Sequence, residues 1–185
     1  ELECKPRINH QARLALQRAR EELQKEGKPF GSDVPLGIMV ETPAAAAMAS
    51  LLAQACDFFS IGTNDLVQYT LAVDRGNSKI SGLYSHFHPA VLRLIQQTAQ
   101  AAHEAGIWVG MCGEMAGDPL ATPLLVAMGF DELSMSAPAL PRVKERVRSL
   151  SRHRADELLA QALKLKESTA IRELLRRNME QESER

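Results

Sequence analysis

The chain has 185 residues, of which 45% are hydrophobic and 24% are charged, and its net charge is −1 at pH 7. This length and composition are typical of about one soluble globular domain. The nearly neutral charge argues against a general binder of nucleic acid or of membrane surfaces. No apolar run approaches the length of a membrane span and no signal peptide is visible, so we expect a cytoplasmic protein without membrane insertion.

The three cysteines are Cys4, Cys56 and Cys112, and no pair of them has the spacing of a metal site. An odd and sparse set of cysteines is typical of a reducing compartment rather than of a disulfide scaffold. Cys56 is predicted to be a small buried hydrophobic residue, as most free cysteines are.

The first predicted elements are a helix over residues 7–26 and a buried strand over Val34–Val40. The strand is assigned because the apolar run is too short for a helix and is bounded by turn residues. Thr42 is predicted to be an N-cap, with Pro43 at the first position of an Ala-rich helix that ends near residue 54.

The same pattern then repeats along the chain. A second buried strand is predicted over Asp57–Ile61, ending in a Gly-Thr-Asn-Asp turn, and an irregular segment follows over 73–84. A helix is predicted from His88 to Gly106, with His88 as its N-cap. A third buried strand is predicted over Ile107–Met111.

The remainder of the chain is predicted to be mainly helical. A helix opens at Asp118-Pro119 and stops at Gly129. After the segment 131–136 we expect helices only, including two over about 153–163 and 167–180. These last two helices indicate packing and no further function.

Apolar strands that alternate with helices predict a parallel sheet covered on both sides. Parallel α/β proteins place their chemistry at the carboxyl ends of the strands, most consistently in the (β/α)₈ barrel. Each of the three predicted strands ends in a reactive or ionisable residue: Glu41, then Asn64-Asp65, then Cys112. The architecture and these residues therefore indicate the same edge of the sheet.

Glu41 and Asp65 are candidate metal ligands, because a carboxylate directly after a buried strand is poorly placed for core packing. Two carboxylates with no His or Cys ligand nearby suit Mg²⁺ or Mn²⁺ better than Zn²⁺. The alternative for either residue alone is an acidic residue in a surface turn.

The other candidates also have ordinary interpretations. The segment Gly62–Asn64 could be a plain turn, and Arg75 could be a solvated loop residue, although beside two carboxylates it would clamp a phosphate. Cys112 could be a small buried residue, but the open Gly-Glu-Met-Ala-Gly backbone after it would leave its thiol reachable for proton transfer.

Three blocks carry a resemblance to a known family: GIMVETP at 37–43, DFFSIGTNDLVQYTLAVDRGN at 57–77 and GMCGEMAGD at 110–118. They closely resemble enzyme I of the bacterial phosphoenolpyruvate:carbohydrate phosphotransferase system, in order and in spacing, over nearly all of residues 1–180. The related dikinases share the Gly-Thr-Asn-Asp block, but they follow Cys-Gly-Glu with His-Gly, whereas this chain has Met115-Ala116. That difference favours enzyme I.

The resemblance implies a role for each matching residue. Glu41 and Asp65 match the two metal-binding carboxylates, which implies Mg²⁺ as the cofactor. Asn64 and Asp65 match the pair that contacts phosphoenolpyruvate, and Arg75 matches a phosphate-binding arginine. Cys112 matches the proton donor that converts the enolate to pyruvate.

The resemblance also implies the architecture and the partners. Residues 1–150 would be the last three βα units of a (β/α)₈ barrel that is incomplete in this chain, and residues 151–185 a helical tail packed on it. The family's partners would be phosphoenolpyruvate and pyruvate, an HPr-like phosphocarrier acceptor, and a second copy in a homodimer.

Two departures from the family pattern accompany this resemblance. The sequence contains no Gly-rich Thr-Ser-His segment of the kind that holds the phosphorylated histidine, and it lacks the arginines of earlier barrel strands. Because a closed barrel needs eight strands and three are predicted here, and because the chain begins at Glu1 without an initiator Met, we expect a C-terminal fragment. Since the acceptor histidine is absent, we expect this fragment to be inactive alone. The alternative from another class is a non-catalytic remnant that only dimerises or binds a partner.

Overall fold

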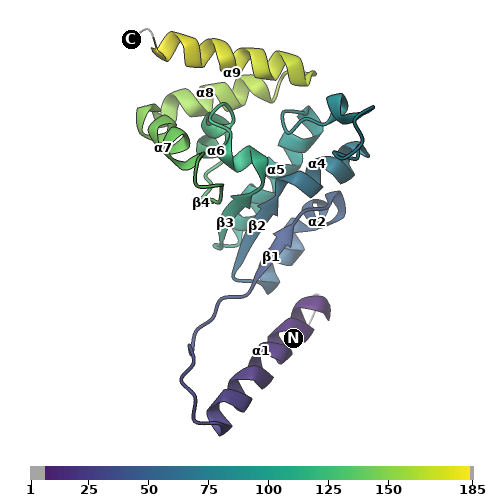
Figure 1. Ribbon diagram of the computed structural model, residues 1–185, viewed down its shortest axis with the longest axis vertical. Coiled ribbons are helices and arrows are strands. Elements are labelled where there is room, and N and C mark those ends of the chain that lie inside the picture. The colour runs from purple at the N-terminus through teal and green to yellow at the C-terminus, as the bar shows by residue number, and fades with distance from the viewer. Residues whose placement is uncertain (1–6, 184–185) are drawn as a thin grey trace.

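The computed structural model describes residues 7–183, in which four parallel strands form one sheet with helices packed against it (Figure 1). The strands are β1 (Gly37–Val40), β2 (Phe58–Gly62), β3 (Trp108–Cys112) and β4 (Glu132–Leu133). The α-helices are α1 (Arg7–Lys25), α2 (Pro43–Ala47), α3 (Ala49–Leu52), α4 (Thr63–Leu71), α5 (Pro89–Glu104), α6 (Thr122–Ala127), α7 (Leu140–Ser149), α8 (Arg152–Ala162) and α9 (Ser168–Ser183). Three short 3₁₀ helices are η1 (Ala53–Ala55), η2 (Ser81–Leu83) and η3 (Glu114–Gly117). None of the helices in the described part of the chain is both long and apolar enough to cross a membrane.

The strands lie side by side in the order in which they occur in the chain, β1-β2-β3-β4, and all pairs are parallel. This is the arrangement of successive units in the wall of an α/β barrel. The predicted α/β class is therefore confirmed. The predicted number of strands was wrong: β4 is a fourth strand, and it escapes a periodicity search because it has two residues.

One face of the sheet is packed against helices, and this face contains most of the core. Phe59 and Ile61 of β2 and Val109 and Met111 of β3 are essentially inaccessible to solvent. They alternate with the residues of the other face, as the period of two in a strand requires. Helix α5 contacts β2 and β3 on the buried face.

The opposite face of the sheet is only partly covered, so the prediction of burial on both sides was wrong for residues 7–183. Phe58 and Trp108 stack on this face with their ring centroids 4.2 Å apart, and Trp108 is 38% exposed. Met39 of β1 is 54% exposed. In a barrel this would be the interior face, which is covered by the strands on the far side of the barrel.

The predicted starts of two helices are confirmed. The Thr42 side chain accepts a hydrogen bond from the Ala45 N–H at 3.2 Å, and Pro43 occupies the first turn of α2. His88 caps α5 through Nδ1, which accepts the Ala90 N–H at 3.2 Å.

Several boundaries differ from the prediction. Of the strand expected over Val34–Val40, only residues 37–40 form a strand, β1. The backbone of Leu36 bonds to Asp57 just before the pairing of β1 with β2 begins. The Ala-rich helix is divided into α2, α3 and η1, since the backbone leaves the α conformation at Met48 (φ −99°, ψ 9°). The second and third predicted strands begin and end one residue later than expected.

The Gly-Thr-Asn-Asp segment was predicted to be a turn, but it is the start of α4. Gly62 is the N-cap, and Thr63, Asn64 and Asp65 form the first turn of the helix. The same small polar residues are favoured in turns and at helix starts, because both leave backbone N–H groups to be satisfied. The strand therefore runs directly into a helix at this point.

The helix predicted to open at Asp118-Pro119 starts later, at Thr122. The Asp118 side chain instead holds a turn, in which Oδ1 accepts the Leu120 N–H at 2.9 Å. The helix stops near Gly129, as predicted, where the backbone has φ +77°.

The C-terminal helices and the N-terminal helix lie at opposite ends of the molecule (Figure 1). The predicted helices over 7–26, 153–163 and 167–180 are confirmed as α1, α8 and α9. Helix α8 packs on α6, and α9 packs on α8. An extended segment joins α1 to β1, and the Arg13 guanidinium lies 3.2 Å from the Asp57 carboxylate. The predicted division of the chain at residue 150 stays a prediction.

Candidate functional site at the carboxyl edge of the sheet

The register of the strands brings the predicted site residues to one edge of the sheet. Val40 is paired with Ile61, and Gly62 is paired with Cys112. Glu41, the first turn of α4 and the loop after Cys112 therefore leave the sheet side by side. This is the edge at which α/β barrels place their active sites.

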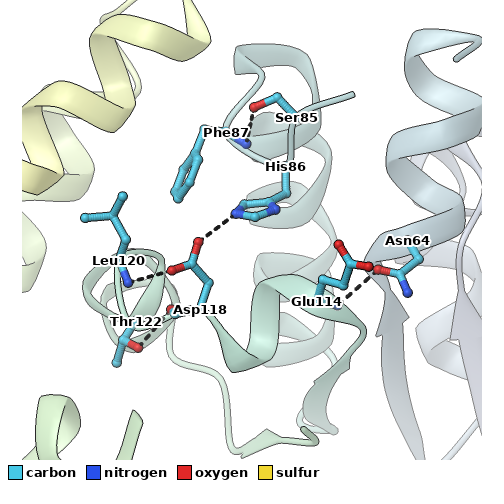
Figure 2. Close-up of polar contacts among 8 residues, drawn as sticks. All are labelled: Asn64, Ser85, His86, Phe87, Glu114, Asp118, Leu120 and Thr122. Carbon is cyan, nitrogen blue, oxygen red and sulfur yellow. Dashed lines mark hydrogen bonds and ion pairs between the residues drawn. The ribbon is translucent and has the colours of Figure 1, made fainter. Parts of the chain in front are cut away.

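Asn64 is held by two loops that come from different parts of the chain. Its side-chain Oδ1 accepts the Glu114 N–H at 3.0 Å, and its backbone carbonyl accepts the Tyr84 hydroxyl at 3.1 Å. Figure 2 shows the amide nitrogen pointing away from Glu114. With Oδ1 engaged in this way, Nδ2 is the part of the amide that can donate to a ligand.

Glu41 and Asp65 are brought to the start of α4. A Cβ atom at Gly62 would lie 3.0 Å from both Cβ and Oε2 of Glu41. The absence of a side chain at Gly62 therefore leaves room for the Glu41 side chain. Asp65 lies in the first turn of the same helix, where a negative charge is favoured by the helix dipole. Both side chains are half-buried.

These two carboxylates are chemically suited to Mg²⁺. Oxygen ligands from one or two carboxylates, completed by water and substrate oxygens, are typical of magnesium sites. The described residues contain no group of three or more His, Cys, Asp or Glu that could hold a metal ion by themselves. A cation at Glu41 and Asp65 would therefore be held by the protein and a ligand together. The metal remains a proposal.

Cys112 is half-buried at the end of β3, and its thiol is directed at β2. The sulfur accepts a hydrogen bond from the Ser60 hydroxyl and donates to the Ile61 carbonyl, both at 3.6 Å. The Cys112 carbonyl accepts the Thr63 hydroxyl at 3.0 Å, which ties the end of β3 to the first turn of α4. The second free cysteine, Cys56, is buried as predicted, and burial raises the pKa of its thiol. Cys4 lies outside the described residues.

Arg75 is exposed in the loop after α4, and its backbone N–H contacts the Gln68 side chain at 3.4 Å. Its charge acts on Tyr84. Burial raises the pKa of the Tyr84 hydroxyl, the negative charges of Glu114 and Asp65 raise it further, and the charge of Arg75 opposes them. Arg75, Asp65 and Glu114 thus all lie within electrostatic range of the tyrosine that contacts Asn64.

A hollow of about 540 Å³ opens beside Asn64 at this edge. Its lining residues come from the starts and ends of several elements: Asn64, Gly113, Glu114, Gly117, Ser134, Met135, Ser136 and Ala139. Glu41, Asp65, Arg75 and Cys112 do not line it. Among the predicted site residues, the hollow therefore contacts Asn64. Glu41, Asp65 and Cys112 lie at or next to the neighbouring strand ends, and Arg75 lies in the loop after α4.

Three residues of this region were not predicted from the sequence. Tyr84 contacts Asn64, which is 20 positions away in the chain, and no local sequence pattern predicts this contact. Ser134 and Ser136 follow β4, which was missed. The rule that chemistry follows a strand would have indicated them if the short strand had been recognised.

A parallel α/β sheet that gathers carboxylates, an amide and a thiol at its carboxyl edge is typical of the class of α/β domains that bind ligands at this edge. Residues 6–152 match the family described as PEP-utilising enzyme, PEP-binding domain. The chain belongs to this family, as the three sequence blocks suggested.

Relatives with assigned names agree with this membership. The chain is 50% identical over 163 residues to a phosphoenolpyruvate-protein phosphotransferase of Haemophilus influenzae, covering 88% of this chain and 28% of the relative. It is 48% identical to the Staphylococcus aureus protein of that name, covering 83% of this chain and 27% of the relative. It is 50% identical to that of Priestia megaterium, covering 77% and 25%. The chain thus spans about a quarter of the length of these relatives.

Proposed function

We propose that this chain binds phosphoenolpyruvate at the carboxyl edge of its sheet, as part of a phosphoenolpyruvate-protein phosphotransferase of the enzyme I type. Support comes from the family match, from relatives at 48–50% identity that carry this name, and from the site itself. The observation that carries the proposal is the pairing of Gly62 with Cys112, because it brings the first turn of α4 against the candidate proton donor.

The phosphate and carboxylate of the substrate would be held by this chain's own groups. Helix α4 has no side-chain N-cap, so its first N–H groups are available to an anion. The Asn64 Nδ2 donates to a phosphate oxygen, and the Arg75 guanidinium adds a charge-assisted hydrogen bond. When bound, Mg²⁺ held by Glu41 and Asp65 would neutralise negative charge on the substrate.

The reaction breaks the bond between phosphorus and the enol oxygen. The phosphoryl group passes to a histidine on another domain, and the electron pair stays on the oxygen of the pyruvate enolate. Cys112 then transfers its thiol proton to the methylene carbon, which gives pyruvate and leaves a thiolate. Since the thiol is directed at the Ile61 carbonyl here, the sulfur must give up this weak bond before it donates.

Calorimetric titration of the chain with phosphoenolpyruvate, with and without Mg²⁺, tests binding. We expect Mg²⁺-dependent binding, weakened at least tenfold in Glu41→Gln and Asp65→Asn, because a lost hydrogen bond or charge contact to an ion is worth about 1.5–3 kcal/mol. Asp156→Asn is the matched control, since Asp156 forms an exposed ion pair with Arg152 on α8. Equal affinities in all four proteins would contradict the proposal.

We also propose that the chain takes no phosphoryl group onto itself. The acceptor would be a histidine on another domain, from which the group passes to an HPr-like carrier, and this sequence has no Gly-rich Thr-Ser-His segment. Incubation with phosphoenolpyruvate labelled in its phosphate should leave the pure chain unlabelled. Acid-labile label on any of its histidines would contradict this part of the proposal.

A further inference from the structure

A second polar pair lies beside the candidate site, and no role in the reaction is assigned to it above. His86 Nε2 lies 3.1 Å from Asp118 Oδ2, and the two side chains are 16% and 29% exposed. His86 belongs to the loop before α5 and Asp118 to the loop after η3, so the pair joins two loops that are 32 positions apart (Figure 2). The carboxylate can only accept, so Nε2 carries the hydrogen.

The Asp118 carboxylate is held in its charged form by its surroundings. Burial alone would raise its pKa, but the hydrogen bond from His86 and the Leu120 N–H outweigh burial and lower the pKa below the ordinary value, aided by the charges of His86 and Arg172. One oxygen bonds Leu120 and the other bonds His86. A hydrogen bond to a charged acceptor is roughly twice as strong as a neutral one.

The loop before α5 and the η3 segment, which this pair joins, both contact Asn64 as well. Tyr84, two residues before His86, donates its hydroxyl to the Asn64 carbonyl at 3.1 Å. Glu114, four residues before Asp118, donates its N–H to the Asn64 Oδ1 at 3.0 Å. The contacts close a ring with Asn64 at one side and the pair at the other, part of which Figure 2 shows.

We propose that His86 and Asp118 are positioning residues that fix the orientation of the Asn64 amide. By holding the two loops together, they keep the Glu114 N–H on Oδ1, and this leaves Nδ2 directed away from Glu114. The effect on ligand binding rests on the proposed function, in which Nδ2 donates to the phosphate. The effect on the Asn64 contact does not depend on any ligand.

The hydrogen bond can be separated from the packing of the histidine ring. His86 also contacts the Phe87 ring, with centroids 4.3 Å apart, and the Arg172 guanidinium lies 5.4 Å from the centroid of the Phe87 ring. His86→Ala removes both the donor and the ring. His86→Gln removes the ring but places an N–H donor close to the position of Nε2.

His103 provides the matched control. Its Nε2 lies 3.0 Å from the Gly129 carbonyl, so it also joins two segments that are distant in the chain. It lies in the last turn of α5, whereas His86 precedes the start of that helix. His103→Ala therefore removes a comparable contact away from Asn64.

Amide hydrogen exchange, measured by NMR on the whole chain without ligand, tests the proposal. We expect the Glu114 amide to exchange about tenfold faster in His86→Ala, the effect of losing one charge-assisted hydrogen bond, and less than threefold faster in His86→Gln. The Met111 amide in β3 should be unchanged, which would show that the fold is intact. Unchanged Glu114 exchange in His86→Ala, or equal acceleration in His103→Ala, would overturn the proposal.

A titration of the same variants with phosphoenolpyruvate and Mg²⁺ separates this inference from the proposed function. We expect weaker binding in His86→Ala and recovery in His86→Gln. If the wild-type chain binds no phosphoenolpyruvate while the exchange pattern is as expected, the proposed function fails and the positioning of Asn64 is supported. If binding is unaffected although Glu114 exchange accelerates, the role of the pair in binding is overturned.

Discussion

At the scale of single residues, the site depends on Gly113. Its backbone has φ +101° and ψ −175°, a conformation that side-chain-bearing residues rarely adopt. A Cβ atom there would lie 2.5 Å from the Thr63 Oγ1 and 3.0 Å from the Asn64 Oδ1. The glycine thus allows the loop after Cys112 to approach the first turn of α4, so that Glu114 can bond Asn64.

Gly113→Ala should lower the free energy of unfolding by about 1–3 kcal/mol, because it imposes a strained backbone and a collision with Thr63. Gly82→Ala is the matched control, since no atom lies within 4 Å of its Cβ position and its φ is not in the positive region. That variant should change the free energy by less than about 0.5 kcal/mol. Urea unfolding checks both values, and equal stability of the two variants would contradict this role of Gly113.

At the scale of elements, the sequence predicts best where the signals are local. The starts of α2 and α5 are correct because Thr42 and His88 cap them through their own side chains. The end of α5 is correct because Gly106 follows it with φ +72°. Helix α4 was missed, since its first residues are equally common in turns, and β4 was missed because it is defined only by pairing with β3.

The same distinction separates the site residues that were predicted from those that were not. Asn64 and Cys112 were found because they lie after or at the end of a strand, and the end of a buried strand can be read from the sequence. Tyr84 was not found, because its contact with Asn64 depends on the path of a long loop. The exposure of Met39 also could not be predicted, because its neighbours across the sheet decide it.

Asp57 anchors the start of β2 and gives a prediction about pH. Its Oδ2 accepts the Leu36 N–H at 2.6 Å, and its Oδ1 lies 3.2 Å from the Arg13 guanidinium. The Leu36 hydrogen bond is the main cause that lowers the pKa of Asp57 below its ordinary value, and the hydrogen bond and charge of Arg13 lower it further. A lowered pKa in the folded state means that the charged form stabilises the fold at a pH above about 3.9, and that this contribution is lost as the pH falls through the lowered value.

Asp57→Asn should therefore be less stable than the wild type between about pH 5 and pH 7, and the difference should shrink below about pH 4 as the wild-type carboxylate is protonated. The effect should be small, because Asp57 and Arg13 are each about two-fifths exposed, at 42% and 40%. Denaturant unfolding at several pH values measures it. A difference that persists undiminished to pH 3 would exclude the carboxylate charge as its cause.

At the scale of the whole molecule, the candidate site exists because a parallel sheet gathers distant segments at one edge. Residues from Glu41 to Ala139 contribute to this region, although nearly a hundred positions separate them. The other face of the described sheet is open, with Met39 and Trp108 exposed. The chain covers 25–28% of the Haemophilus influenzae, Staphylococcus aureus and Priestia megaterium relatives. We therefore propose ligand binding for this edge of the sheet, and the complete reaction only for a phosphotransferase of which this chain is a part.

The central claim is that the metal and phosphoenolpyruvate bind together at the carboxyl edge. The most direct test replaces Mg²⁺ with paramagnetic Mn²⁺ and follows the broadening of each backbone amide signal by NMR as phosphoenolpyruvate is added. We predict that the signals of residues 62–65 and 112–114 broaden first, while those of His103 and Gly129 stay sharp. Broadening centred on α7, α8 and α9, or no broadening that depends on phosphoenolpyruvate, would contradict the claim.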